Sequence, residues 1–347
     1  MRVLQLGPYP PPHGGVQTNL VAIREYLRQR QIPCAVINIT GTRRESADGV
    51  YYPRSALEVA RLLLRLDYDI VHLHLGGNLT LRLLGLSLFC SWLPRRKSVL
   101  TFHSGGYPSS KEGQTAGPLT LRGFVFRRLD RVIGVNPEIV ELFRKFGLRP
   151  DRVRLIYPHA PAAPPPGTDL PEPLRGFTAS HRPLLLTVGL LEPEYDLPIQ
   201  IEVLGRIRER FPGAGLVIIG SGSLEEELRH RIEAVPYREH ILLCGDVPHA
   251  ATLRAIAECD LFLRTTLYDG DSISVREALH LGTTVIATDN GMRPAGVHLI
   301  PPSDLAALGQ AIEAQLARCG SRQRQSESSE ENIKAVYDLY QELMNEK

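Results

Sequence analysis

Short apolar segments alternate with amphipathic helical segments along nearly the whole chain, and the alternation breaks once and then begins again. In the first stretch, strands are predicted at Arg2–Gly7, Cys34–Ile39, Ile70–His74, Ser98–Phe102, Arg131–Val135 and Val153–Ile156. The helices between them are predicted at Val16–Arg30, Ser55–Leu66, Leu79–Leu93, Leu119–Leu129 and Pro137–Phe146. Apolar strands separated by helices indicate a parallel sheet that is covered on both faces.

The break is the proline-rich stretch 158–174, which has the composition of a semi-rigid linker. After it, strands are predicted at Leu184–Val188, Gly215–Ile219, His240–Leu243, Leu261–Leu263, Thr284–Ala287 and Val297–Ile300. Helices are predicted at Leu197–Arg210, Leu224–Ala234, Ala250–Glu258, Leu305–Arg318 and Asn332–Met344. Because 347 residues are too many for one ordinary core, the restart predicts a second α/β domain.

Charge and cysteine content narrow the class of protein. The formal net charge is +2, far from the basic excess of a nucleic-acid-binding protein. Five cysteines are scattered without C-x-x-C spacing, which is typical of reduced thiols in a cytoplasmic protein. A strand is predicted directly after Met1, and no apolar run reaches the ~20 residues that span a bilayer. We therefore expect neither a signal peptide nor a membrane-spanning helix.

Residues 269–289 combine a polar turn, a helix and a strand in a pattern that suits phosphate binding. The helix is predicted to begin near Ile273 and to end at Gly282, a residue typical of helix C-termini. Unpaired N–H groups and the positive end of the dipole attract anions to a helix N-terminus. Glu277 follows Asp269 by eight positions and can accept hydrogen bonds from a ribose diol. Two carboxylates around an anion site indicate a nucleotide-sugar and not a metal.

This stretch resembles the E-x7-E segment of retaining GT-B glycosyltransferases, in the large family that includes bacterial polysaccharide and phosphatidylinositol mannosyltransferases. The family pattern is E-G-F-G-L-P-x-x-E-A-x-x-x-G-x-P-V, and the chain reads D-G-D-S-I-S-V-R-E-A-L-H-L-G-T-T-V. Glu277, Ala278, Gly282 and Val285 match the pattern, and Asp269 replaces the first glutamate.

The resemblance implies a GT-B fold, in which two Rossmann-like domains with parallel sheets face a central cleft. The implied divisions are an acceptor-side domain at 1–157, the linker 158–174, a nucleotide-sugar domain at 175–328, and 329–347, whose helix returns to the first domain. The implied activity is that of a retaining hexosyltransferase, which moves a sugar from a nucleotide-sugar to a saccharide or lipid-linked acceptor. Envelope polysaccharide or glycolipid synthesis is the implied setting.

The family motifs also imply roles for particular residues. His103 and Asp269 take the catalytic positions, with His103 at the reacting centre and Asp269 at the sugar hydroxyls. Glu277 is expected to bind the ribose, and backbone N–H groups around Ser272–Ser274 are expected to bind the phosphate. The full nucleotide-sugar-binding set is Gly14, Gly15, Gly189, Asp271, Ser272, Ile273, Ser274, Glu277, Arg264 and Arg293. The alternative for Gly14 and Gly15 is that they only make a turn.

The chain departs from the family after the first strand of the second domain. The family shows G-R-L-x-x-x-K-G there, and its arginine and lysine grip the donor diphosphate. Leu190 and Tyr195 stand in their places, and a buried diphosphate without positive partners would be costly. Arg264 or Arg293 is predicted to compensate, more readily than Arg276, which points about 100° away from Glu277 around the helix. The alternative is a family member that has lost its catalytic activity and acts as a subunit with a partner protein.

Two metal sites are alternatives that we do not favour. Asp269-Gly270-Asp271 can be read as an Asp-x-Asp motif for Mg²⁺ or Mn²⁺. His72 and His74 share one face of a strand and could form a zinc site with His103, although no carboxylate or cysteine stands at ligand spacing. We expect no metal and no cofactor.

The segment 79–97 is strongly apolar and ends in Arg95-Arg96-Lys97. It either packs against the first sheet or rests on an anionic membrane, where it would suit a lipid-linked acceptor. The predicted location is cytoplasmic, with peripheral contact at the inner face of the membrane as an alternative. A nucleotide-sugar epimerase shares the two-domain layout and is a further rival, although it lacks the E-x7-E spacing.

Overall fold

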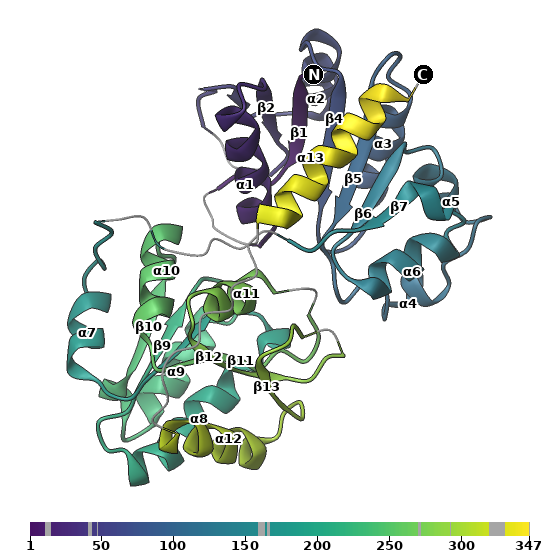
Figure 1. The fold of residues 1–347 in the computed structure, drawn as a ribbon. Helices are drawn as coiled ribbons and strands as arrows, with labels where there is room; N and C mark the ends of the chain where they lie inside the picture. Colours follow the sequence, from purple (N-terminus) through teal and green to yellow (C-terminus); the bar gives the residue numbers. More distant parts are fainter. Residues whose placement is uncertain are drawn as a thin grey trace. The chain divides into compact units, whose positions relative to one another are not determined.

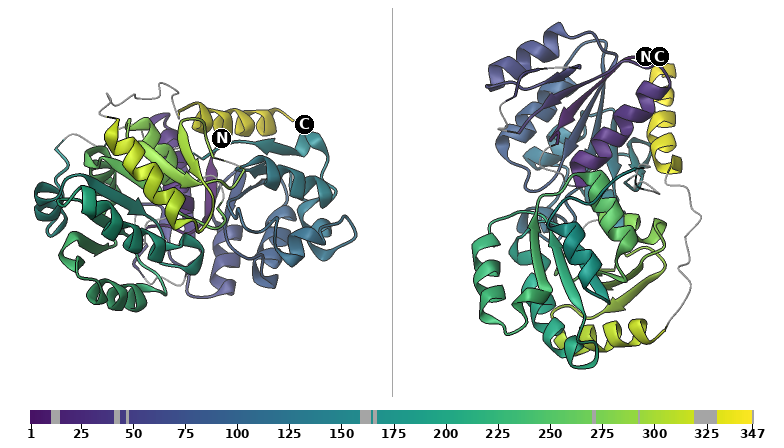
Figure 2. Two further views of the ribbon diagram at one scale, coloured as in Figure 1. Left: turned by 90° about the horizontal axis from the view of Figure 1, so that it is seen from below. Right: turned by 90° about the vertical axis from the view of Figure 1, so that its left-hand side faces the viewer.

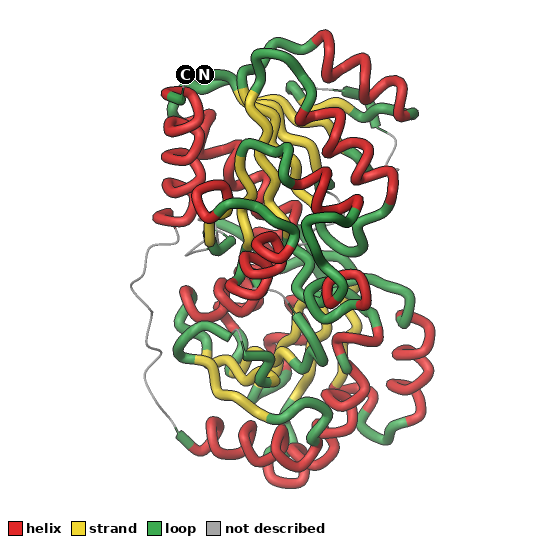
Figure 3. The backbone as a smooth tube through the Cα atoms, turned by 90° about the vertical axis from the view of Figure 1, so that its right-hand side faces the viewer, coloured by secondary structure: helices red, strands yellow, loops and turns green. Residues whose placement is uncertain are grey.

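The computed structural model describes residues 1–10, 15–40, 44–46, 48–158, 164, 167–269, 272–291, 293–318 and 330–346. The chain divides into two compact units, unit 1 (Met1–His159 with Glu330–Lys347) and unit 2 (Ala160–Ser329). Each unit has a parallel sheet with helices on both of its faces (Figures 1 and 3). The predicted α/β fold with two parallel sheets is confirmed.

Unit 1 is built on a seven-stranded sheet with the order β3-β2-β1-β4-β5-β6-β7. Its strands are β1 (Val3–Gly7), β2 (Cys34–Asn38), β3 (Val50–Tyr51), β4 (Ile70–Leu75), β5 (Lys97–Phe102), β6 (Arg131–Gly134) and β7 (Val153–Leu155). Its helices are α1 (Gly15–Gln29), α2 (Ala56–Arg65), α3 (Leu81–Ser91), α4 (Lys111–Gln114), α5 (Leu121–Phe126), α6 (Pro137–Lys145), the 3₁₀ turn Pro150–Arg152 and α13 (Glu330–Asn345).

Helix α13 belongs to unit 1 although it follows the whole of unit 2 in the sequence. It lies beside α1, as two views show (Figures 1 and 2). Its buried side chains Val336, Leu339, Tyr340 and Leu343 share one apolar cluster with residues of β1, α1, β4, β5 and β6. The helix therefore covers one face of the unit-1 sheet together with α1.

Unit 2 has a six-stranded sheet with the order β10-β9-β8-β11-β12-β13. Its strands are β8 (Leu184–Val188), β9 (Gly215–Ile219), β10 (Ile241–Gly245), β11 (Leu261–Arg264), β12 (Thr284–Thr288) and β13 (Val297–Ile300). Its helices are α7 (Leu174–Ser180), α8 (Leu197–Arg210), α9 (Glu225–Ala234), α10 (His249–Glu258), α11 (Ile273–His280), α12 (Leu305–Ala317) and the 3₁₀ turns Pro193–Tyr195 and Arg238–His240.

The unit-2 sheet has a topological switch point between β8 and β11. From β8 the chain builds outward through β9 to β10, and it then returns to lay β11 on the other side of β8. The loops that leave β8 and β11 therefore turn to opposite faces, and ligands of open α/β sheets bind at such a point beyond the strand ends. Both strands are buried and parallel, with Phe262 of β11 paired to Leu186 of β8.

Three short elements were not expected from the sequence. Strand β3 has two residues and exists through its pairing with β2. Helix α4 is a single turn capped by Ser110, and the predicted helix 119–129 shortens to α5. Helix α7 begins at the buried Leu174, inside the stretch read as linker.

Among the helices of the described residues, none is long and apolar enough to cross a membrane.

Candidate functional site

The carboxyl edge of the unit-2 sheet gathers most of the predicted nucleotide-sugar residues. Gly189 directly follows β8, Arg264 ends β11, and Arg293 lies between β12 and β13. Helix α11 begins at Ile273 after the loop that leaves β11. Gly14 and Asp271, which belong to the same predicted set, lie outside the described residues. Gly15 is the first residue of α1 and belongs to unit 1.

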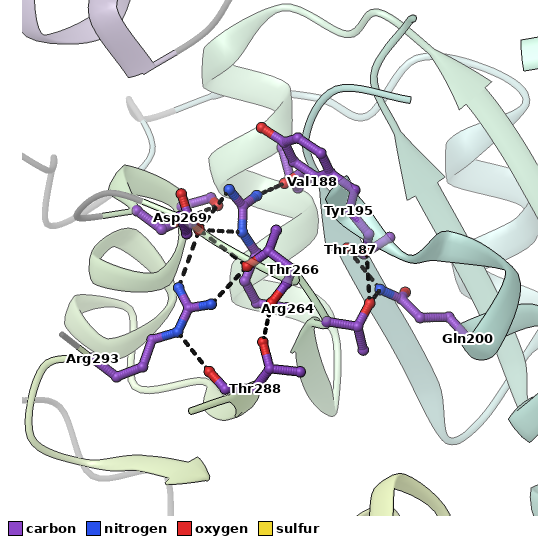
Figure 4. A network of polar contacts seen from close by, with 12 residues as sticks. Thr187, Val188, Tyr195, Gln200, Arg264, Thr266, Asp269, Thr288 and Arg293 are labelled. Carbon is purple, nitrogen blue, oxygen red and sulfur yellow. Dashed lines mark hydrogen bonds and ion pairs between the residues drawn. The ribbon is translucent and has the colours of Figure 1, made fainter. Parts of the chain in front are cut away.

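Asp269 lies between the two arginines that the sequence offered as replacement cations (Figure 4). Its Oδ2 accepts hydrogen bonds from Nε of Arg264 at 2.9 Å and from Nη1 of Arg293 at 3.1 Å. Thr266 Oγ1 donates to the same oxygen at 3.4 Å. Burial alone would raise the pKa of Asp269, but the two guanidinium groups outweigh it and lower that pKa. The cluster thus holds two positive charges and one negative charge.

Each guanidinium is fixed by further contacts. Arg264 donates from Nη1 to the carbonyl oxygen of Val188 at 2.9 Å, which joins the ends of β11 and β8. Arg293 donates from Nε to the Thr288 carbonyl at 3.0 Å and from Nη2 to Thr266 Oγ1 at 2.7 Å. Both arginine side chains are more than nine-tenths buried. Such a network holds its charges in one geometry.

Tyr195, which stands where the family has a lysine, lies against Arg264. The guanidinium carbon is 4.5 Å from the centre of the tyrosine ring, a distance typical of a cation–π contact. Gly189 leaves room for this pair, because a Cβ there would come within 2.2 Å of the Tyr195 ring and 2.9 Å of Arg264 Nη1. Leu190, at the family's arginine position, is about half exposed. A cation is therefore present near this loop, but it comes from β11.

Among the described residues, no side chain caps the N-terminus of α11. Ser272 takes the N-cap position with its side chain buried, yet Oγ accepts no hydrogen bond from the first amides of the helix. Instead it lies 3.2 Å from Ser274 Oγ. At the other end, Gly282 adopts a φ of 76°, the left-handed conformation that ends helices and favours glycine. The helix thus starts and stops where its sequence predicts.

Glu277 lies on α11 and is paired with a residue that the sequence analysis did not single out. His249, the first residue of α10, approaches with Nε2 at 2.7 Å from Glu277 Oε1. The Glu277 side chain is 4% exposed and that of His249 is 26% exposed. Burial alone would lower the pKa of His249, but the hydrogen bond and the charge of Glu277 raise it. The one signal in the sequence was its position, because His249 comes four residues after the end of β10, at the carboxyl edge of the sheet.

The loops after β9 and β10 add two polar contacts at the same edge. Ser223 donates to Glu192 from both its backbone N–H and its hydroxyl group, at 2.9 and 2.5 Å. Ser221 Oγ lies 3.0 Å from both carboxylate oxygens of Asp246. These contacts tie the loops that follow β8, β9 and β10 to one another.

His103 lies in unit 1, directly after β5. Its ring stacks on that of His74, with 5.9 Å between ring centres, and its backbone N–H donates to Leu75 O at 2.8 Å. The buried Nε2 has no hydrogen-bond partner among the described residues. Burial lowers the pKa of His103 to about 3, so the ring is neutral at neutral pH.

His72 and His74 are fully buried in β4 and belong to a hydrogen-bonded network. His72 Nδ1 lies 2.5 Å from the Tyr340 hydroxyl of α13, and Nε2 lies 2.7 Å from Thr101 Oγ1. His74 Nε2 lies 2.9 Å from Gln5 Oε1. In the part of the chain that the structure describes, no three His, Cys, Asp or Glu side chains are grouped as a metal site requires.

Two family models match consecutive parts of the chain. The model described as glycosyl transferase 4-like domain matches residues 6–159, and the model described as glycosyl transferases group 1 matches residues 175–331. Phosphatidyl-myo-inositol mannosyltransferase of Mycobacterium tuberculosis is 25% identical over 365 residues, which cover 93% of this chain and 90% of the relative.

Solved structures share the fold at low identity. HepE of Anabaena, in complex with UDP and glucose, superposes with a TM-score of 0.70 at 16% identity and covers 100% of both chains. WaaG, a glycosyltransferase involved in lipopolysaccharide biosynthesis, superposes with a TM-score of 0.65 at 16% identity, over 97% of this chain and 95% of that one.

Proposed function

The chain belongs to the GT-B glycosyltransferases of family four, and on this premise we propose that it moves a sugar from a nucleotide-sugar to a saccharide or lipid-linked acceptor with retention. The observation that carries the proposal is the Arg264–Asp269–Arg293 cluster at the switch point of the unit-2 sheet. A buried diphosphate needs positive partners, and two buried arginines at this point support the proposal.

The net positive charge of the cluster balances much of the negative charge of a diphosphate. Two guanidinium groups and one carboxylate leave a net charge of about +1, and the N-terminus of a helix such as α11 adds roughly +0.5. A nucleotide-sugar diphosphate carries about two negative charges, so most of its charge is balanced without a metal ion. Tyr195 contributes by supporting Arg264 through its ring. We therefore propose that this donor site is metal-independent.

Carboxylates would contact the donor's hydroxyl groups. Within the described residues, Asp269 makes its hydrogen bonds through Oδ2, which leaves Oδ1 for a sugar hydroxyl. Glu277 uses Oε1 for His249, which leaves Oε2 for the ribose. The backbone amides at Ser272–Ser274 would bind phosphate oxygens, as at other helix N-termini.

Retention needs no protein nucleophile in the proposed mechanism. The leaving phosphate oxygen takes the proton of the acceptor hydroxyl on the face where the new bond forms, and the protein positions both groups and stabilises charge. Because its pKa is low, His103 would act as a neutral hydrogen-bonding group at the reacting centre and not as a proton donor.

We propose that unit 1, which contains the acceptor-side domain, contacts an anionic membrane at the inner face of that membrane. Helices α3 and α5 pack together, and large apolar side chains in them or beside them are exposed, namely Leu81, Trp92, Leu119, Leu121 and Phe124. The surrounding stretch 79–131 is basic, with nine Lys or Arg residues against Glu112 and Asp130. Exposed apolar side chains within a basic stretch suit a surface of anionic lipid. The names of the mannosyltransferase relative and of WaaG support a lipid-linked acceptor.

Thermal-shift screening with a panel of nucleotide-sugars tests the donor site, because a specific donor raises the melting temperature by mass action. The donor that binds is then used in a transfer assay, with the anomeric configuration of the product read by NMR. We expect a retained configuration and equal rates with EDTA and with Mn²⁺. An inverted product would contradict retention, and activity lost with EDTA would favour the metal reading of Asp269 and Asp271.

A second candidate function is that of a non-catalytic subunit. It is favoured by one observation, the absence of the family's arginine and lysine at Leu190 and Tyr195. Under this reading no nucleotide-sugar shifts the melting temperature, and activity appears only when a partner protein is added.

A further inference from the structure

We propose that His249 is a positioning residue of the donor site, which holds the Glu277 carboxylate so that its second oxygen faces the ribose. The inference rests on the proposed function, because it needs Glu277 to contact a nucleotide. It adds a residue that the E-x7-E pattern does not contain. His249 lies on a different helix from Glu277 and precedes it by 28 positions.

The geometry supports a fixed orientation. The 2.7 Å contact joins His249 Nε2 to Glu277 Oε1, and α10 packs against α11. A carboxylate on a helix can turn about its own side-chain bonds, and a single strong hydrogen bond to one oxygen removes that freedom. With Oε1 engaged, Oε2 is the atom left for a ligand, and within the described residues it makes no hydrogen bond.

Burial gives the pair a second role. Glu277 is 3% exposed, so its negative charge needs a compensating group within the protein. The described contacts supply one such group, His249, whose pKa the carboxylate raises. Without it, the buried Glu277 carboxylate would lose this compensating partner, which is costly for a charge within a protein.

The position of His249 is not explained by helix formation. It is the first residue of α10, where the positive end of the helix dipole disfavours a cationic side chain. Residues that stabilise this end are acids or hydroxyl-bearing caps, and Pro248 before it provides no side-chain cap. A histidine at this place therefore disfavours the helix slightly, and its contact with Glu277 is a compensating interaction.

The test compares ribonucleotides with deoxyribonucleotides. Calorimetry measures the Kd of UDP and GDP, and of their 2′,3′-dideoxy forms, for the full chain and for His249→Leu, His249→Gln and Glu277→Ala. We expect His249→Leu and Glu277→Ala to weaken ribonucleotide binding roughly tenfold and to leave dideoxy binding unchanged. His249→Gln, whose amide can donate to Oε1, should restore most of the loss. The control is His230→Gln, at an exposed histidine of α9.

Each contrary result has a distinct meaning. If His249→Leu keeps the wild-type ratio of ribo to dideoxy affinity while Glu277→Ala loses it, His249 has a structural role alone and the inference is wrong. If the wild-type protein itself binds both forms equally, Glu277 does not contact the ribose. If the wild-type protein binds no nucleoside diphosphate, both the proposed donor site and the inference about His249 are wrong.

Discussion

Asp269 holds two buried arginines through a single carboxylate oxygen, so its removal leaves two like charges close together with no counter-ion. Breaking a buried ion pair by removing one partner typically costs about 3–5 kcal/mol, because the remaining charge is left uncompensated. The same charges are proposed to serve the donor. Asp269 is therefore expected to contribute both to the stability of unit 2 and to donor binding.

Asp269→Ala is expected to destabilise unit 2 by about 3–5 kcal/mol, measured by calorimetric unfolding. A matched control is Glu225→Ala, which removes an exposed i,i+4 partner of Arg229 in the same unit and should cost about 0.3–0.5 kcal/mol. Equal effects of the two substitutions would contradict the buried cluster. A saturating nucleoside diphosphate should recover part of the Asp269→Ala loss, because it supplies the missing negative charge.

Arg264→Ala and Arg293→Ala are each expected to weaken donor binding at least about tenfold without added metal, since a charge-assisted hydrogen bond contributes ~1.5–3 kcal/mol. Arg264→Lys keeps the charge and should lose less. Calorimetry with the donor found by screening measures the effect, and Arg229→Ala on α9 is the control. Wild-type affinity in the double alanine variant would show that the arginines do not replace the family's missing cations.

At the scale of elements, the unit-1 sheet contains a pH-sensitive feature. His72 and His74 are fully buried in β4, and burial lowers the pKa of His72 to about 3 and that of His74 well below its usual value. In the unfolded chain these groups titrate near 6.5. Between those values the unfolded state binds more protons, so the stability of unit 1 falls as the pH falls below about 6.5.

We expect a loss of up to about 1.4 kcal/mol per pH unit for each buried histidine between pH 6 and pH 4. Trp92 is the one tryptophan of the chain and lies in unit 1, so its fluorescence during urea unfolding reports this unit. His74→Gln should reduce the slope by about one proton, whereas the exposed His230→Gln should not. An unchanged slope in His74→Gln would show that His74 is not neutral in the folded state.

Long periodic elements were predictable because local pattern and tertiary packing agree there. The strands β8 and β9 and the helix α8 have the predicted bounds, and the helix of the E-x7-E segment begins at Ile273 as expected. Elements such as β3 and α4 were missed because two or four residues carry no period, and pairing or a cap decides them. Pattern also placed Arg264 and Arg293 near the loop, but not their shared contact with Asp269.

The pair His249 and Glu277 shows why site chemistry is harder to predict than site position. Glu277 was found by its offset from Asp269, a relation within one segment. Its partner lies on another helix, and only the packing of α10 on α11 brings them together. Likewise, the sequence alone indicates that a cation is lost where Tyr195 replaces the family's lysine. The structure shows that the guanidinium group of Arg264 lies over the ring of Tyr195.

At the scale of the whole molecule, each unit has its own sheet and apolar clusters, and unit 1 is discontinuous in the sequence. Helix α13 contributes four fully or nearly buried apolar side chains to one cluster of unit 1, and Tyr340 also contacts His72. At about 1.5–3 kcal/mol for each buried side chain, the helix contributes roughly 6–12 kcal/mol. That range is similar to the whole stability of an ordinary domain.

Deletion of residues 330–347 is therefore expected to unfold unit 1 and leave unit 2 folded. The truncated chain should lose the Trp92 transition, while a calorimetric transition for unit 2 persists at the wild-type temperature. Deletion of residue 347 alone is the control, since α13 ends at Asn345 and both its apolar face and the ion pair of Glu346 with Arg131 are kept. A native Trp92 transition in the longer deletion would mean that the unit-1 sheet does not need this helix.

The place of α13 in the sequence also sets an order of events on the ribosome. Residues 1–159 emerge first, yet the sheet face that α13 covers stays open while all of unit 2 is translated. Domains commonly fold in the order of their synthesis, but here the half that is made first is closed after the half that follows it. Translation that stops between the two units, or anywhere before residue 330, yields a nascent chain with an exposed apolar sheet, which chaperones and proteases recognise. The helix thus closes unit 1 only after unit 2 has been made.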